Sequence, residues 1–313
     1  MKWLFGLCVC VLTIPSAFAD NGDKPGWAPS KFGAADRLGS MNYLTPEKTA
    51  AAAKLVTTGK TYALGMVTGR ATPAYPPRKY DVIVLQLDDG TGTPVGLNDA
   101  TANDDMVETF NGIGSQIDGL GHFGKNHYYY NGVHASEFVA TDGLKQFGIH
   151  TLPPVATRGI LLDMTKAYDG VRVPDGTALN KAEIDAAMKR AGVTVEQGDI
   201  VLLHTGNMTA TAGDTTLAQL VPGLGVEGAQ YLAELGVVAV GTDTWALEVI
   251  PFENEGSFFE VHQTLLTKNG VYLLENMVTA ELAADGVTEF FFTLGTPRLE
   301  GTVQAIINPV AIR

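Results

Sequence analysis

The sequence predicts a single α/β domain built around a mixed β-sheet. Apolar strand-like runs alternate with amphipathic helical runs along much of the chain, but several strand-like runs follow one another without a helix between them. Alternation favours parallel strands with helical crossovers, whereas directly successive strands favour antiparallel pairs. The two together indicate a mixed sheet rather than a doubly wound parallel one. The chain has 313 residues and no internal repeat, which favours one large domain.

Residues 1–19 have the pattern of a cleaved signal peptide. Lys2 supplies a positive charge, residues 3–14 are almost wholly apolar, and Ala17-Phe18-Ala19 fits a small-residue cleavage site. The alternative, an N-terminal membrane anchor, is disfavoured because the apolar run is shorter than the roughly 18 residues that a span needs. We therefore expect cleavage after Ala19 and a periplasmic or secreted protein that has no further contact with the membrane.

Charge and cysteine content exclude several classes of partner and site. Without residues 1–19 the chain carries 20 basic and 34 acidic side chains, a net charge of −14. Nucleic acids and anionic membranes require a basic surface, so neither is an expected partner. Cys8 and Cys10 leave with the signal peptide, which excludes disulfides and thiolate metal ligands from the mature chain. Any metal site must therefore use oxygen and imidazole ligands.

The first expected elements are an arm, a helix and a strand. Residues 20–40 are rich in Gly, Pro, Asp and Lys, which indicates an N-terminal arm lying over the domain rather than a separate domain. A helix is expected over 46–57, because Thr45 is a suitable N-cap, a proline occupies the first helical position and Gly59 follows the end. Residues 61–67 then have the composition of a strand.

Two loops flank the next expected strand, over 82–87. Residues 69–79 combine prolines with basic side chains, which is typical of a loop, and residues 88–105 are polar and glycine-rich, which predicts a flexible excursion. Long loops inside a compact domain are frequently active-site lids. We expect these two loops to set the choice of substrate.

The second half contains two clear helices and a series of strands. A helix is expected over 181–191, with Asn180 and Glu183 as a capping box and Gly192 closing it, and another over 226–235. Strands are expected at 160–164, 200–203, 237–240, 271–274, 290–294 and 303–307. Neither a dinucleotide-binding glycine pattern nor a phosphate-binding loop occurs, so nucleotide binding has no support.

Asp118 and His122 give the first indication of a metal site. They lie four residues apart in the glycine-rich stretch 112–122, together with Gln116. Asp and His are common metal ligands, and Gln can add a neutral oxygen. The glycines disfavour a helix, so we expect a loop wrapped around an ion. The structural alternative is a turn stabilised by the aspartate beside a surface histidine.

His262 and Glu275 are the second pair of candidate ligands. His262 precedes Leu265 and Leu266, which places its imidazole on a half-buried helix, and Glu275 ends an apolar run. Alone, each has a structural interpretation, as a core histidine bonded to a carbonyl and as a solvated strand end. Together with Asp118 they would give one ion three protein ligands and open positions for water, which is the arrangement of a catalytic metal site.

The stretch Gly112–His122 resembles a known signature. In the metal-dependent cyclase family, which includes bacterial kynurenine formamidases, isatin hydrolases and metal-dependent dienelactone hydrolases, the pattern is H-x-G-T-H-x-D-x-P-x-H, followed much later by a His and a Glu. The segments 38–47 and 241–244 also resemble that family. The resemblance implies a swivelling β/β/α fold over residues 41–313, and many members of the family are dimers or tetramers, so it implies a homo-oligomer.

The resemblance also implies which residues hold the metal. Gly112 and Gln116 replace two histidines that hold one metal in the two-metal members, Ser115 replaces Thr and Leu120 replaces Pro. The ligands of the other metal map onto Asp118, His262 and Glu275. The resemblance therefore implies one divalent ion, Mn²⁺ or Zn²⁺, with Gln116 as an additional weak ligand. His122 maps onto a histidine interpreted as a proton shuttle, with direct metal binding as the alternative.

The expected function is hydrolysis of a small cyclic ester or amide of the lactone type by a metal-activated water. The alternatives are an arylformamidase-like amide hydrolase, a cyclase or lyase of the same family, and a periplasmic binding protein for a metal or small molecule with a degraded site. His127, Tyr128 and His134 follow the signature and could line a substrate pocket, although tyrosine runs are also common in strand packing.

Overall fold

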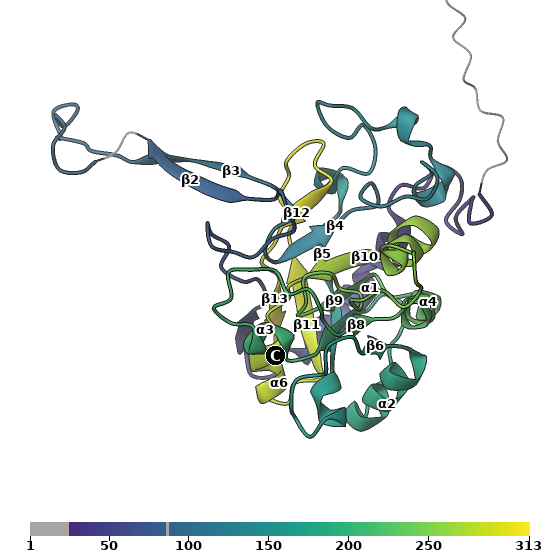
Figure 1. Cartoon of the computed structure of the whole chain (residues 1–313). Helices are drawn as coiled ribbons and strands as arrows, with labels where there is room; N and C mark the ends of the chain where they lie inside the picture. Colours follow the sequence, from purple (N-terminus) through teal and green to yellow (C-terminus); the bar gives the residue numbers. More distant parts are fainter. Residues whose placement is uncertain (1–24, 86–87) are drawn as a thin grey trace, which may run out of the picture.

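The computed structural model describes residues 25–85 and 88–313, which form one α/β unit around a nine-stranded sheet (Figure 1). The predicted signal peptide and its cleavage site after Ala19 lie outside the described residues. The sheet is mixed, as predicted from the alternation of strands and helices. Its strand order is β1-β13-β11-β5-β7-β9-β10-β4-β12.

Four parallel strands form the centre of the sheet. They are β5 (Val155–Asp163), β7 (Ile200–His204), β9 (Ala239–Thr242) and β10 (Tyr272–Glu275). Antiparallel strands extend the sheet on both sides: β11 (Glu289–Leu294), β13 (Val310–Ile312) and β1 (Thr61–Ala63) beyond β5, and β4 (Gln116–Asp118) and β12 (Gln304–Ile306) beyond β10. The connections between the parallel strands contain helical segments, whereas each antiparallel pair of this sheet joins strands that are not consecutive in the chain.

Two helices are confirmed at their predicted bounds. They are α2 (Lys181–Ala191) and α4 (Val226–Leu235), each followed by a glycine in the left-handed conformation. Glu183 accepts a hydrogen bond from the backbone N–H of Asn180, as the capping-box pattern predicts. The Asn180 side chain in turn accepts from Gly228 N, which ties α2 to α4.

The first helix is shorter than predicted. α1 spans Pro46–Ala52 and tightens into a 3₁₀ turn that ends at Leu55 instead of continuing to Thr57. The chain leaves the helix because Thr58 and Gly59 donate hydrogen bonds to the carbonyl of Arg313. A contact with the far end of the chain therefore overrides local helix propensity.

The remaining short elements connect the sheet strands. They are α3 (Asn207–Ala210), α5 (Glu260–His262), the π-helical segment Gln263–Asn269, α6 (Ala280–Ala284), the paired strands β6 (Ala178–Leu179) and β8 (Gly223–Leu224), and 3₁₀ turns at Gly39–Tyr43, Tyr130–Gly132, Ala135–Glu137, Ile149–Thr151 and Met164–Ala167. None of the helices among residues 25–85 and 88–313 is long and apolar enough to cross a membrane.

The excursion expected over 88–105 is the outer part of a β-hairpin. β2 (Tyr80–Leu85) pairs along its whole length with β3 (Asp104–Thr109), and the ribbon projects away from the rest of the domain (Figure 1). β3 was not predicted because it begins with two aspartates, which are disfavoured in strands. Five apolar side chains of the hairpin are 42–50 % exposed: Ile83, Val84, Leu85, Met106 and Val107.

Most other strands lie within a few residues of their predicted positions. The strand predicted over 61–67 ends at Ala63, because Leu64 then donates to Pro309 O and Met66 to the Ser115 hydroxyl. The strand predicted over 160–164 begins earlier, at Val155, because residues 155–160 pair with β11. The arm, described from residue 25, lies against Asn131, whose side chain binds the backbone of Ser30 and Gly33.

The central strands supply the core. Every residue of β7 is buried, and Leu203 has no exposed surface. We predict that Leu203→Ala lowers the free energy of unfolding by about 2–5 kcal/mol, because it removes buried methyl groups and leaves a cavity. Chemical denaturation measures this change. The matched control is Leu97→Ala, the same change at a fully exposed position of the hairpin tip, and an equal loss in both variants would contradict the assignment of the core.

Candidate metal centre

The antiparallel pairing of β4 with β10 brings together the first side chains of the site. Gln116 lies opposite Glu275 in this antiparallel pair, and Asp118 lies two residues further along β4 on the same face. The expected loop around an ion is therefore wrong for this segment: Gln116–Asp118 is a strand, and the chain turns only after Asp118. The glycines serve close packing instead, since a Cβ at Gly119 would lie 2.8 Å from the carbonyl oxygen of Val303.

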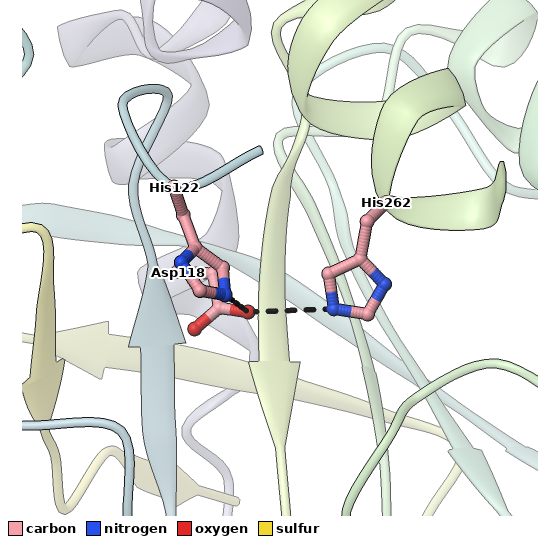
Figure 2. A group of neighbouring side chains, drawn as sticks. All are labelled: Asp118, His122 and His262. Atoms are coloured by element: carbon pink, nitrogen blue, oxygen red, sulfur yellow. Dashed lines mark ion pairs between the residues drawn. The ribbon is translucent and has the colours of Figure 1, made fainter. Parts of the chain in front are cut away.

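Two imidazoles approach the same oxygen of the Asp118 carboxylate. Figure 2 shows His122, on the turn after β4, and His262, on α5, with their rings directed at the same carboxylate. Asp118 Oδ2 lies 3.8 Å from His122 Nε2 and 3.7 Å from His262 Nε2. Each of the three side chains offers one donor atom, and the three atoms lie within 4.8 Å of one another. This group can hold a metal ion.

The hydrogen bonding of Asp118 leaves one oxygen for such an ion. Oδ1 accepts from Gln304 Nε2 at 2.7 Å and from Gln116 Nε2 at 3.1 Å. Oδ2 is buried and has no hydrogen-bond partner among the described residues. Burying an unpartnered carboxylate oxygen is costly, and a cation beside it removes that cost. The side chains present therefore fit a bound metal.

Glu275 extends the same donor set. Its Oε1 lies 3.3 Å from His262 Nε2, and its Oε2 accepts a hydrogen bond of 2.7 Å from Gln116 Nε2. Ligands held at about 2.0–2.2 Å around a tetrahedral ion are roughly 3.3–3.6 Å apart. The separation of Glu275 and His262 matches that range. Glu275 is buried rather than solvated, which excludes the interpretation of it as a solvated strand end.

Gln116 is oriented as a donor in this arrangement. Its amide nitrogen donates to Asp118 Oδ1 and to Glu275 Oε2, so one amide group bridges the two acidic side chains. The amide group therefore holds the two carboxylates in position. In this orientation its nitrogen, which does not bind metals, is the atom that faces them.

His262 is oriented by a carboxylate that the sequence analysis missed. Glu248 is buried, and its Oε1 lies 2.5 Å from His262 Nδ1. This contact keeps a proton on Nδ1, on the side of Glu248, so that in the neutral imidazole the Nε2 lone pair would face Asp118 and Glu275. A carboxylate behind a histidine is the usual support of a metal ligand. The signal in the sequence is a single acidic residue within the apolar run 246–250.

Burial and charge shift the pKa values of three of these groups. Burial alone would lower the pKa of His262, but hydrogen bonds to Glu248 and Glu275 outweigh it and raise the pKa to about 10. Burial, followed by the charge of Asp118, raises the pKa of Glu275 to about 7. Burial lowers the pKa of His122 to about 4. Without a metal, a proton on His262 offsets the carboxylates at neutral pH, while His122 is neutral.

Aromatic rings close one side of the centre. Phe123 and Phe259 pack against each other and both lie against the ring of His262, at centroid distances of 4.7 and 5.1 Å. His122 also contacts Phe123, and its side chain retains 16 % exposure. His122 is therefore the member of the group through which solvent and substrate can reach the centre.

The three expected pocket residues form a cluster of their own. The ring of His134 packs against Tyr128 at 5.1 Å and against His127 at 6.1 Å. His134 also accepts a hydrogen bond from Ser136 N in the short turn that follows it. These contacts describe a surface cluster next to the signature, and the structure does not bring them into the group formed by Asp118, His122 and His262.

Two further side chains near the centre were not singled out from the sequence. Gln304, on the edge strand β12, donates to Asp118 and lies 3.4 Å from His122 Nε2. Arg78, in the loop expected over 69–79, donates to the carbonyl of Gly112 at 2.6 Å. Gln304 could have been found as the polar residue of an apolar strand, but nothing local to Arg78 distinguishes it from the other basic residues of its loop.

Comparison with known proteins identifies the fold and the family. A family model described as "Putative cyclase" matches residues 35–249. A crystal structure described as that of a novel cyclase is 27 % identical, with a TM-score of 0.80, covering 90 % of this chain and 98 % of its own. None of the curated proteins compared with the chain matches it.

Isatin hydrolases have the same fold at lower similarity. Isatin hydrolase A from Labrenzia aggregata, bound to benzyl benzoate, is 14 % identical with a TM-score of 0.62, covering 80 % of this chain and 93 % of its own. The enzyme from Ralstonia solanacearum is also 14 % identical with a TM-score of 0.62, covering 86 % and 98 %. The family model covers most of the chain and the fold agrees, so this chain belongs to the cyclase family.

Proposed function

We propose that this protein is a metal-dependent hydrolase of a small cyclic ester or amide, of the lactone type. The observation that carries the proposal is the unpartnered, buried Oδ2 of Asp118, which lies within 3.8 Å of an imidazole nitrogen of both His122 and His262. The structural relatives include an isatin hydrolase and a potential metal-dependent hydrolase with cyclase activity, which supports the reaction class. The lactone-type substrate rests on the resemblance of the signature.

We assign the ion to Asp118 Oδ2, His262 Nε2 and Glu275 Oε1. The carboxylate behind His262 and the amide of Gln116 between the two acidic ligands support this set. Imidazole and carboxylate ligands suit Mn²⁺ and Zn²⁺ alike. When bound, such an ion polarises the scissile carbonyl and lowers the pKa of a water molecule toward neutrality.

His122 moves the proton in the proposed reaction. Its pKa is lowered to about 4, so the imidazole is neutral at neutral pH and can accept a proton at Nε2. Gln304 Nε2 lies 3.4 Å from His122 Nε2 and so restricts the position of the His122 ring. His122 takes a proton from the attacking water and returns it to the leaving oxygen or nitrogen of the opened ring. The apolar wall of Phe123 and Phe259 excludes bulk water from the same side.

The ligand assignment predicts the metal content. Elemental mass spectrometry should find about one Mn²⁺ or Zn²⁺ per chain, and His262→Ala should lose it. The control is His150→Ala, because His150 binds the backbone of Gly301 away from the centre. Two ions per chain would contradict the assignment, and no ion after reconstitution would favour a binding protein with a degraded site.

Metal binding should weaken as the pH falls. The raised pKa values of His262, about 10, and of Glu275, about 7, mean that protons compete with the ion below these values. Each displaced proton lowers the apparent affinity by roughly tenfold per pH unit. The metal-induced rise in melting temperature should therefore be larger at pH 8 than at pH 6, and an equal rise at both would speak against these ligands.

The proposed proton shuttle predicts a loss of turnover without a loss of metal. His122→Ala should lower kcat for lactone hydrolysis by about 10²–10⁴-fold, which is the usual contribution of a general base. Elemental analysis of the same sample should give an unchanged metal content, with His150→Ala as the matched control. If His122→Ala loses the ion, His122 is a ligand, which is the alternative assignment.

We also propose that the chain forms a homo-oligomer through the hairpin β2–β3. Its apolar side chains are half exposed on a ribbon that projects from the domain, and exposed apolar strands commonly pair with another chain (Figure 1). Val84→Asp should shift the protein toward monomer in sedimentation velocity at constant concentration. Val171→Asp, at a 65 % exposed position outside the hairpin, is the control, and a wild-type monomer would disprove the proposal.

A further inference from the structure

The absence of a side chain at Gly112 leaves space for the guanidinium of Arg78 beside the metal centre. A Cβ at Gly112 would lie 2.6 Å from Gln304 Oε1 and 2.8 Å from Arg78 Nη1. Any side chain at position 112 would therefore displace the amide of Gln304, the guanidinium of Arg78, or both. The same Gln304 donates to Asp118 Oδ1 and lies 3.4 Å from His122. Arg78 is thus separated from the ligand Asp118 by one side chain.

The guanidinium of Arg78 is only partly used. Its Nη1 donates to the carbonyl of Gly112, and within residues 25–85 and 88–313 the structure gives it no other hydrogen bond and no ion pair. By contrast, two other half-buried arginines, Arg158 and Arg172, are paired with carboxylates. A guanidinium carries five N–H donors in a planar fork, so most of the donors of Arg78 remain available.

Arg78 lies next to the side chains of the centre. Its Nη1 and the side chain of Gln304 both border the space beside Gly112, and Gln304 in turn donates to Asp118 and lies 3.4 Å from His122 Nε2. Asp118, Glu275 and Glu248 make the surroundings strongly acidic, and an anionic group would be repelled unless a cation received it. The metal and Arg78 are the two cations available there, and a forked guanidinium matches the geometry of a carboxylate.

We propose that Arg78 binds a carboxylate substituent of the substrate, so that the preferred substrates are small cyclic esters or amides carrying a negative charge. This inference rests on the proposed hydrolase function and specifies its substrate class. The unused donors of Arg78 hold the carboxylate, and the ring carbonyl then lies on the side of Asp118 and His122. Arg78 acts as a specificity residue and takes no part in proton transfer.

The inference is tested with a matched pair of lactones. The probes are γ-butyrolactone and 5-oxotetrahydrofuran-2-carboxylate, which has the same ring and one added carboxylate. Wild-type protein should prefer the acid in kcat/KM, and Arg78→Met should reduce that preference by about 10- to 100-fold, as expected for a charge-assisted contact. Arg78→Lys should retain part of it, because lysine keeps the charge without the fork. Arg70→Met is the control, since Arg70 pairs with Asp81 in the same part of the chain.

A binding measurement separates this inference from the hydrolase proposal. Calorimetry on metal-loaded protein compares cyclopentanecarboxylate with its neutral analogue cyclopentanecarboxamide, neither of which is a lactone. Tighter binding of the carboxylate, lost in Arg78→Met with the metal content unchanged, would support the role of Arg78 even if no lactone is hydrolysed. An unchanged preference in Arg78→Met would overturn it. Loss of the metal in Arg78→Met would also overturn it, since Arg78 would then support the fold of the Gly112 segment.

Discussion

The register between β4 and β10 is the constraint on which the rest of the site depends. It sets Gln116 opposite Glu275 and keeps Asp118 on the same face, so that two carboxylates from distant parts of the chain share one amide donor. A shift of one residue would turn these side chains to the other face of the sheet. The register is held because β4 is paired on both sides, by β10 and by β12, and its three residues are buried.

Burying these carboxylates makes a cation necessary. Asp118, Glu248 and Glu275 are each less than 5 % exposed, and uncompensated buried charges cost several kcal/mol each. In the absence of metal the compensation comes from a proton on His262 and a raised pKa of Glu275. A divalent ion replaces those protons with a stronger charge at the same place. The negative charge of these buried carboxylates therefore favours the binding of a cation at the centre.

The sequence predicts those features that depend on local signals. The helix over 181–191 follows from its capping box and closing glycine, and the α/β class follows from the order of helices and strands. Strand β4 could not be predicted, because its three residues lie between glycines that locally indicate a loop. Gln304 and Asp118 are 186 residues apart in the sequence, so their contact is a property of the sheet and not of a motif.

The departures from the family signature form one consistent arrangement. Gln116 places its amide nitrogen against the carboxylates, and the glycine at 112 lets Gln304 and Arg78 occupy the space beside it. A histidine at position 116 would therefore lose the amide that bridges the two acidic side chains. A histidine at position 112 would collide with the amide of Gln304 and the guanidinium of Arg78. A second metal would also lie close to the guanidinium charge. These contacts are consistent with the proposed single-ion centre, because neither position is left as an empty ligand site.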